Sequence, residues 1–303
     1  MNVAFTVITP SYNQGKYIRA TVESVLSQRL PGLQYLVMDG GSSDETLDVL
    51  RSYGDRLWFC SEPDRGTADA VNKGLARAEG DLIGWLNSDD VYYPGALARV
   101  AALFERHPEV DVVYGRAHHV DEAGRILEEY PTEDWSFLRL LEHCIISQPA
   151  AFFRRCAVEK FGLLAENHRY CVDYELWIRW AQRGAQFMYV PEFFAATRLH
   201  DAAKTVAFRV QCHGDVNDVM VERLGHVPSR WIANYAYART EQQVDRIRHR
   251  LTFTAFLVAQ CLFTDLRWNK RISLSTIRMF LSWVDGYRQR LVPLRPASRR
   301  SFV

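Results

Sequence analysis

The sequence has little of what would assign it to several common protein classes. Its 37 Lys and Arg residues nearly balance its 36 Asp and Glu residues, and a formal net charge of +1 provides no field that would attract nucleic acid. We therefore expect no nucleic-acid partner. The six cysteines show neither close pairing nor a Cys-x-x-Cys spacing. This pattern argues against a zinc site and a disulfide framework, and it favours a reducing, cytoplasmic setting.

Long apolar segments and targeting signals are also missing. The N-terminus enters a β-like run without a basic leader or the apolar core of a signal peptide, so we expect no export. The most apolar late segment, residues 251–263, contains Thr and Gln and is shorter than the roughly 20 apolar residues that span a bilayer. We therefore predict that it is not a transmembrane helix.

What is present is a regular alternation of strand-like and helix-like patterns. Short apolar runs occupy residues 3–9, 35–39, 57–60, 82–86 and 110–114, with amphipathic helical patterns between them. This alternation predicts an α/β fold with a mainly parallel sheet covered by helices on both faces. From about residue 206 the strand-like runs thin out. We therefore predict an α/β domain over residues 1–205 and a helical region over residues 206–303.

Polar segments follow each of the first four predicted strands. They are residues 9–13, 39–44, 62–66 and 87–90. Ligands of parallel sheets bind beyond the carboxyl ends of the strands, so we expect these segments to converge on one rim.

The segment that most clearly indicates a binding site is Asn87-Ser88-Asp89-Asp90. Adjacent carboxylates that leave a buried strand repel one another unless a cation offsets them, and Mg²⁺ or Mn²⁺ takes such oxygen ligands while keeping positions for phosphate. The alternative is that these residues only form a turn or cap the helix predicted near Pro94.

Two further loops have polar side chains in suitable positions. Asp39 follows a strand and precedes two glycines, so it can accept a hydrogen bond from a base N–H or a ribose hydroxyl. The alternative for this loop is helix capping by Ser43. Arg65 can offset phosphate charge, or it can form a solvated surface pair with Asp64.

Taken together, the motifs resemble those of the family 2 glycosyltransferases, which have the GT-A fold. The resemblance rests on Thr9-Pro10-Ser11-Tyr12-Asn13, on Asp39-Gly40-Gly41-Ser42-Ser43-Asp44-Glu45-Thr46 and on the segments 24–28, 64–66, 69–74, 80–90, 147–155, 173–177 and 198–200. It covers roughly residues 1–205, and matches in this order and spacing are more specific than any single motif.

The resemblance implies a role for each matching residue. It assigns nucleotide-sugar binding to Pro10, Tyr12, Asp39, Arg65, Asn72, Asn87 and Ser88. It assigns a Mn²⁺ or Mg²⁺ cofactor to Asp89, with Asp90 and His200 assisting. Asn87 replaces the first acid of the family's Asp-x-Asp motif, and the second acid is present as Asp89.

Asp173 matches the position of the family's catalytic base, although Val172 replaces the Glu that usually precedes it. From the residues alone, Asp173 could instead be an N-terminal helix cap. The resemblance implies direct displacement at the anomeric carbon, in which Asp173 deprotonates the acceptor hydroxyl and the configuration is inverted.

The implied donor is a nucleotide diphosphate sugar, with UDP favoured and GDP or dTDP as alternatives, and the implied acceptor is a glycan or a lipid-linked acceptor of surface polysaccharide or glycolipid synthesis. Two other functions stay open: a nucleotidyltransferase, which lacks support because no Gly-rich phosphate loop is found, and a non-catalytic nucleotide-sugar-binding protein. The basic and apolar residues after 250 fit either peripheral contact with the inner face of the membrane or packing on the core or a second subunit. The sequence does not predict an oligomeric state.

Overall fold

The computed structural model describes residues 5–201 and 203–289, and the chain divides into two compact units. The first unit comprises residues 1–140 and 144–207, and the second comprises residues 141–143 and 208–303. From the loss of strand-like patterns we predicted a boundary after residue 205, whereas this division falls after residue 207 and also assigns residues 141–143 to the second unit. Each unit is described by itself below.

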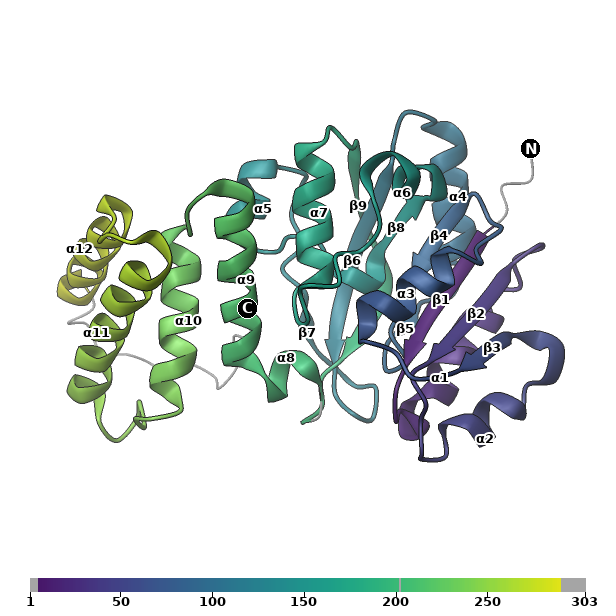
Figure 1. Ribbon diagram of the computed structural model, residues 1–303, viewed down its shortest axis with the longest axis horizontal. Helices are drawn as coiled ribbons and strands as arrows, with labels where there is room; N and C mark the ends of the chain where they lie inside the picture. Colours follow the sequence, from purple (N-terminus) through teal and green to yellow (C-terminus); the bar gives the residue numbers. More distant parts are fainter. Residues whose placement is uncertain (1–4, 202, 290–303) are drawn as a thin grey trace. The chain divides into compact units, whose positions relative to one another are not determined.

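The first unit contains all the strands of the described chain (Figure 1). The strands are β1 Phe5–Ser11, β2 Gln34–Asp39, β3 Trp58–Ser61, β4 Leu82–Trp85, β5 Val91–Tyr92, β6 Val112–Val120, β7 Ile126–Glu129, β8 Ala151–Arg154 and β9 Phe187–Arg198. The helices are α1 Gly15–Leu26, α2 Thr46–Arg51, α3 Thr67–Leu75, α4 Ala96–Arg106, α5 Phe137–Glu142, α6 Arg155–Phe161, α7 Val172–Gln182 and α8 Lys204–Ala207, with 3-10 turns at Gly54–Arg56 and Gln148–Ala150. The last residues of α5 belong to the second unit.

The strands form one sheet in the order β3-β2-β1-β4-β8-β6-β9-β5, with β7 paired to β6. β1 is parallel to β2 and β4, β2 is parallel to β3, and β6 is parallel to β9. The pairs β4–β8, β6–β8, β6–β7 and β5–β9 are antiparallel. The predicted α/β fold is confirmed. Its parallel part is the N-terminal half, and the later strands make the sheet mixed.

Helices cover both faces of the sheet, as predicted. Val7 of β1 packs in one core cluster with residues of α1, α2 and α4, such as Val22. The next residue, Ile8, points to the other face, where α3 approaches so closely that a Cβ on Gly74 would lie 2.5 Å from the Ile8 side chain. Successive strand residues face opposite sides, so β1 requires apolar neighbours on both sides.

The second unit is helical, as expected, over its described residues. Its helices are α9 Arg209–Leu224, α10 Ser229–Glu241, α11 Arg250–Asn269 and α12 Leu274–Gln289. Trp268 of α11 packs edge-on against Tyr235 of α10 and donates a hydrogen bond from Nε1 to Asp218 of α9 at 2.7 Å. No helix in the described ranges is both long enough and apolar enough to cross a bilayer.

A buried ion pair within α7 fixes the helix that begins with Val172 and Asp173. Arg179 contacts Glu175 through Nε and Nη2 at 2.8 and 3.0 Å, and it also donates hydrogen bonds to the carbonyl oxygens of Phe161 and Leu163. Both members of the pair are buried. Removal of one partner would leave the other charge buried without compensation, which is far more costly than losing a surface pair.

We expect Glu175→Ala to lower the free energy of unfolding by about 3 kcal/mol or more. The matched control is Asp48→Ala, which removes an exposed ion pair with Arg51 in α2 and should cost no more than about 0.5 kcal/mol. Urea unfolding followed by tryptophan fluorescence measures both, because Trp177 and Trp180 lie in α7. Equal losses for the two variants would contradict the buried-pair interpretation.

Candidate active site

The strands that precede the predicted site residues end at one edge of the sheet (Figure 1). β8 reverses the chain direction between β4 and β6, so that β1, β2, β4, β6 and β9 all run the same way. The short loop 183–186 joins the end of α7 to the start of β9, at the edge where the parallel strands begin. The first turn of α7 therefore lies toward the other edge, where these strands end. The topology thus brings Asp39, Asp89, Asp173 and His200 to the carboxyl edge of the sheet.

The two adjacent carboxylates after β4 point to different environments. Asp90 is only 2% exposed, and its Oδ1 accepts a hydrogen bond from the Arg198 main-chain N–H at 3.0 Å. Burial, with the charge of Asp89 as a second cause, raises the pKa of Asp90 well above its ordinary value. The side chain of Asp89 is 19% exposed, and it is the acid of this pair that an incoming ligand can contact.

Asp89 is paired with His200. Oδ2 of Asp89 lies 3.1 Å from Nε2 of His200, whose ring is buried and packs 4.6 Å from the ring of Tyr17. His200 also lines a cavity of about 340 Å³, together with residues of the loop after β1, residues of the first turn of α1, and Glu122. A carboxylate and an imidazole at this separation, beside an open space, can hold a divalent cation with further positions left for oxygen ligands.

Arg198 holds this arrangement in place. Its buried guanidinium donates hydrogen bonds to the carbonyl oxygens of Asp89, Asp121 and Glu122 at 3.1, 3.1 and 2.7 Å, and it lies over the ring of Tyr17. One side chain thus ties the loop after β4 to the turn after β6. Sequence reasoning quoted Arg198 within a motif but gave it no role; the available signal was its position two residues before His200.

Asn87 and Ser88 lie within the same loop but face the protein interior. The Asn87 amide accepts a hydrogen bond from Trp85 Nε1 at 3.0 Å and donates one to Gln148 Oε1 at 2.9 Å. Gln148 in turn donates to the Trp85 carbonyl oxygen. Ser88 is buried. Sequence reasoning did not single out Gln148, since nothing local links it to Asn87 in the sequence.

Asp39 closes the turn after β2. Its carboxylate accepts hydrogen bonds from the main-chain N–H groups of Gly41 and Ser42 and from the hydroxyl groups of Ser42 and Ser61. Gly41 has φ +84°, a conformation that glycine adopts without strain. Because the chain itself already supplies four donors, the geometry gives Asp39 a structural task, and its predicted contact with the nucleotide stays a prediction.

In the loop after β2, Ser43 does not cap the following helix, which was the alternative role considered for it. Ser43 makes no cap at α2; its N–H donates to the Asn13 side chain at 2.9 Å. Asp44 instead accepts from the N–H groups of Thr46 and Gly15. Although burial acts to raise its pKa, hydrogen bonds from Thr46 and Gly15 leave the pKa of Asp44 below its ordinary value. The loops after β1 and β2 are therefore joined side by side.

Pro10, Tyr12 and Arg65 occupy the same region with different exposure. Pro10 is buried within β1, whereas the Tyr12 ring is 62% exposed. The Arg65 side chain is 72% exposed, and its Nη2 contacts Asp69 and Glu166, each at 2.7 Å. Arg65 therefore forms a surface ion pair, as the alternative interpretation proposed, but its partners are Asp69 and Glu166 and not Asp64. The guanidinium of Arg65 holds the pKa of Asp69 at about 2.

Asn72 contacts the main chain of a distant loop. Its side-chain amide donates to the Leu164 carbonyl oxygen and accepts from the Leu164 N–H, each at 3.0 Å. This double hydrogen bond ties α3 to the loop before α7. The predicted nucleotide contact of Asn72 has no geometric support, because both polar groups of its amide are already engaged.

Asp173 lies in the first turn of α7 and is partly exposed. Burial is the largest influence on its carboxyl group and raises the pKa of Asp173 above the ordinary range. Tyr130 and Cys144 lie near enough that the Asp173 charge adds to burial in raising their pKa values, that of Cys144 to about 12. A half-buried carboxylate with a raised pKa at a ligand-binding edge suits a general base.

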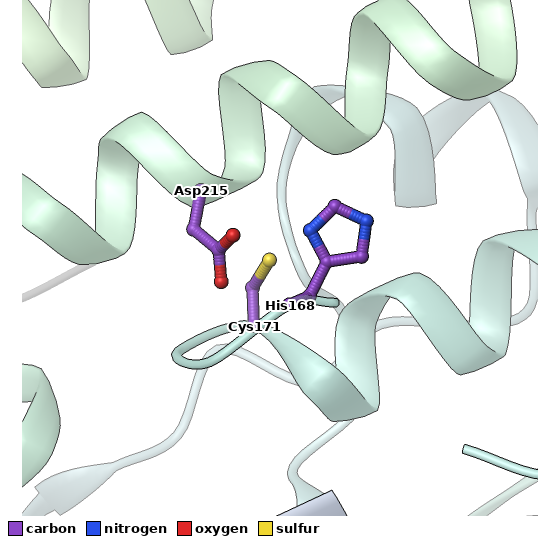
Figure 2. A group of neighbouring side chains, drawn as sticks. All are labelled: His168, Cys171 and Asp215. Atoms are coloured by element: carbon purple, nitrogen blue, oxygen red, sulfur yellow. The ribbon is translucent and has the colours of Figure 1, made fainter. Parts of the chain in front are cut away.

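Two residues just before α7 were not singled out as site residues. Figure 2 draws His168 and Cys171 of this loop, together with Asp215 of α9. These residue types are common metal ligands, but His168 and Cys171 belong to the first unit and Asp215 to the second, and no site is assigned to them. In the described chain none of the six cysteines forms a disulfide.

Comparison with protein families and sequences finds similarity over this unit. Residues 6–162 match the model of the family described as "Glycosyl transferase family 2". An uncharacterised glycosyltransferase of Rickettsia typhi is 29% identical over 209 residues, which cover 66% of this chain and 65% of that protein. A PGL/p-HBAD biosynthesis glycosyltransferase of Mycobacterium tuberculosis is 32% identical over 58% of this chain and 68% of that protein. The match thus spans about two-thirds of each relative.

Solved structures show the same fold. S. aureus TarS residues 1–349, in complex with UDP-GlcNAc, has a TM-score of 0.60 at 16% identity, covering 95% of this chain and 92% of that one. A mannosyltransferase from Pyrobaculum calidifontis, in complex with GDP-Man and Mn²⁺, has a TM-score of 0.56 at 17% identity, covering 94% and 82%. The GT-A fold expected from the sequence is therefore confirmed, and at these identities the likeness concerns the fold alone.

Arg198 provides a direct test of the site's geometry. We expect Arg198→Ala to weaken Mn²⁺ binding by about tenfold or more, because the loop that orients Asp89 loses its support. The matched control is Arg154→Ala, which removes a guanidinium bonded to the carbonyl oxygens of Phe104, His107 and Val110, away from the carboxyl edge. Both variants should lose stability, but only the first should lose Mn²⁺ affinity in a titration followed by electron paramagnetic resonance. Equal Mn²⁺ affinity in the two variants would contradict this role.

Proposed function

The chain belongs to glycosyl transferase family 2, and from this premise we propose that it transfers a sugar from a nucleotide diphosphate donor to a hydroxyl acceptor, with inversion at the anomeric carbon and with help from a divalent cation. One observation supports this most directly. The Asp89–His200 pair and the carboxylate of Asp173 are brought to the same edge of the sheet, where loops from β1, β2 and β4 also end.

The donor atoms at Asp89 and His200 fit a divalent cation. One carboxylate oxygen and one imidazole nitrogen leave most coordination positions open for diphosphate oxygens and water, and we favour Mn²⁺ over Mg²⁺ because of the nitrogen ligand. Such a cation would offset the charge that develops on the departing diphosphate. Asp90 is proposed to support the loop rather than to bind the cation, because its carboxylate is buried against the Arg198 main chain.

Asp173 is the proposed base. Its carboxylate takes the proton of the acceptor hydroxyl as that oxygen forms a bond to the anomeric carbon. The bond from this carbon to the diphosphate oxygen breaks on the opposite side, and the nucleotide diphosphate leaves with the electron pair. The proton ends on Asp173, and the configuration of the sugar is inverted.

The remaining predicted site residues divide into those whose side chains can reach a donor and those whose side chains are engaged within the protein. The exposed ring of Tyr12 is available to contact the base, and Arg65 can turn from its acidic partners toward phosphate oxygens. We propose that Pro10, Asp39, Asn72, Asn87 and Ser88 support the donor site indirectly, because the amides of Asn72 and Asn87 and the carboxylate of Asp39 are engaged within the protein and Pro10 and Ser88 are buried. We place the nucleotide against the loops after β1, β2 and β4.

The donor and acceptor classes follow from the relatives. Fold relatives were solved with UDP-GlcNAc and with GDP-Man and Mn²⁺, so we test UDP-sugars first and GDP- and dTDP-sugars next. The mycobacterial relative is named for PGL/p-HBAD biosynthesis, which supports a glycan or lipid-linked acceptor in surface polysaccharide or glycolipid synthesis. Membership of family 2 leaves the nucleotidyltransferase alternative without support. A cytoplasmic location stays a prediction.

A screen of donors tests binding. We expect one of UDP, GDP and dTDP to stabilise the protein against heat, and Mn²⁺ to increase that shift; a ligand at 100 times its Kd adds about 2.7 kcal/mol. In His200→Gln the Mn²⁺-dependent part should disappear while the nucleotide-only part persists. No shift with any nucleotide, with or without Mn²⁺, would count against the proposed function.

Replacing the base tests catalysis. Asp173→Asn should lower kcat by about 10²- to 10⁴-fold and leave donor binding unchanged, because the amide cannot accept the proton. Asp48→Asn, on the exposed face of α2, is the matched control and should be fully active. If Asp173→Asn transfers sugar at the wild-type rate, another group must be the base; if the wild type binds donors but transfers none, the non-catalytic alternative is favoured.

The raised pKa of Asp173 predicts the acidic side of the pH profile. The base is active only when deprotonated, so kcat should fall as the pH drops through the pKa of Asp173. Because burial raises that pKa, the decrease in kcat should begin at a higher pH than the titration of an ordinary aspartate, whose pKa is about 4. Activity that persists unchanged down to pH of about 4 would contradict this assignment.

A further inference from the structure

Helix α11 of the second unit exposes an apolar face. Between Arg250 and Asp265 no residue is charged, and the side chains of Leu251, Phe256 and Phe263 are 81%, 44% and 57% exposed. Leu266 continues this stripe at 49% exposure. At 1.5 Å per residue the uncharged segment is about 21 Å long, too short to span a bilayer but long enough to lie along its surface.

The opposite face of α11 packs against the other helices of the second unit. Phe253, Cys261, Thr264 and Trp268 are buried there, and Phe253 contacts Tyr237 of α10 edge-on. The exposed stripe is therefore not needed to attach α11 to its neighbours. In the first half of α12, the apolar side chains of Leu274, Ile277 and Leu281 are also exposed. Water-exposed apolar stripes on this scale mark an interaction surface.

Cations lie at the ends of this stripe. Arg250 begins α11, and Arg267, Lys270 and Arg271 follow its apolar segment, all of them exposed. From residue 250 to residue 283 the only acid is Asp265, which is buried and accepts hydrogen bonds from Asn269 and Ser273. The surface thus combines apolar side chains with positive charge and presents no negative charge.

We propose that the outward face of α11 and the start of α12 bind the surface of an anionic lipid bilayer. The aromatic and aliphatic side chains enter the boundary between headgroups and acyl chains, and the flanking Arg and Lys residues contact the lipid phosphates. This inference is independent of the proposed reaction, because it uses none of the residues at the carboxyl edge of the first unit.

Charge argues against two other occupants of this face. In a two-fold dimer formed through the same stripe with antiparallel helices, Arg250 of one copy would face Arg267, Lys270 and Arg271 of the other. Like charges facing one another oppose association. The C-terminal segment 290–303 has four arginines and no acid in its sequence, so it offers the same sign of charge. An anionic bilayer offers the opposite sign.

Vesicle sedimentation tests the proposal with the full chain. We expect the wild type to sediment with vesicles of equimolar phosphatidylcholine and phosphatidylglycerol, and to stay in solution with phosphatidylcholine alone. The double variant Phe256→Ser and Phe263→Ser should bind the anionic vesicles at least about tenfold more weakly, because two inserted aromatic side chains are lost. Its matched control is Ile126→Ser with Leu138→Ser, two exposed apolar residues of the first unit, which should bind like the wild type.

A charge variant separates the electrostatic contribution. Arg267→Gln with Arg271→Gln should weaken binding by about fivefold for each charge removed at low salt, and high salt should reduce the difference. Arg106→Gln, an exposed cation at the end of α4, is the control. Circular dichroism of each variant checks that its helices are intact.

Three outcomes would overturn the proposal. The wild type could stay in solution with anionic vesicles, or the phenylalanine variant could bind them as well as the wild type does. The third outcome concerns the oligomeric state. If the wild type sedimented as a dimer in the ultracentrifuge and bound no vesicles, and if only the phenylalanine variant became monomeric, this face would be assigned to a second copy of the chain. Donor binding and transfer in solution are measured separately, so their failure would leave this result unaffected.

Discussion

The site depends on how the chain separates two adjacent carboxylates. Asp89 and Asp90 leave the same buried strand, and two like charges so close together repel unless their surroundings differ. The main chain of Arg198 holds Asp90 inward, while the guanidinium of the same residue holds the Asp89 carbonyl oxygen. Asp89 is therefore left to face His200, which lines the adjacent cavity. Arg198, at the end of β9, thus holds the two adjacent carboxylates in different directions, and Asp89 keeps the orientation that its proposed role as a cation ligand requires.

The part of this arrangement that local patterns specify could be predicted. The sequence shows β-branched strands, helices of regular period and polar residues after each strand. These patterns suffice to place the ends of β1, β2 and β4 at one edge of the sheet, and Asp39 and Asp89 lie at that edge because they follow β2 and β4. Asp173 could be predicted from its match to a family motif and from its position at the start of a predicted helix, and it lies in the first turn of α7. These features are local in sequence, and local periodicity is what a single sequence reports best.

Features set by distant contacts could not be predicted. The alternation of side chains after β4 does not reveal that Asp90 turns inward, because its partner lies at residue 198. The amide of Asn72 is engaged by Leu164, and that of Asn87 by Gln148, each from a distant part of the chain. β8 gave no periodic signal of its antiparallel pairing with β4 and β6, since it is a short, buried strand with apolar neighbours on both sides.

The same contacts bear on Asn87 and Val172, the two positions at which the sequence departs from the motifs that it resembles. A carboxylate at position 87 would lose the donor that the Asn87 amide gives to Gln148 and would place a further carboxylate beside Asp90, whose Oδ2 lies 3.4 Å from the Asn87 nitrogen. Val172 is buried at the start of α7, where a glutamate would be desolvated next to Asp173 and would raise the pKa of that base further. Both replacements remove a charge that the surrounding protein would have to bury, and both leave Asp89 and Asp173 in place. The departures therefore fit the proposed site, which concentrates its negative charge on one proposed cation ligand and one proposed base.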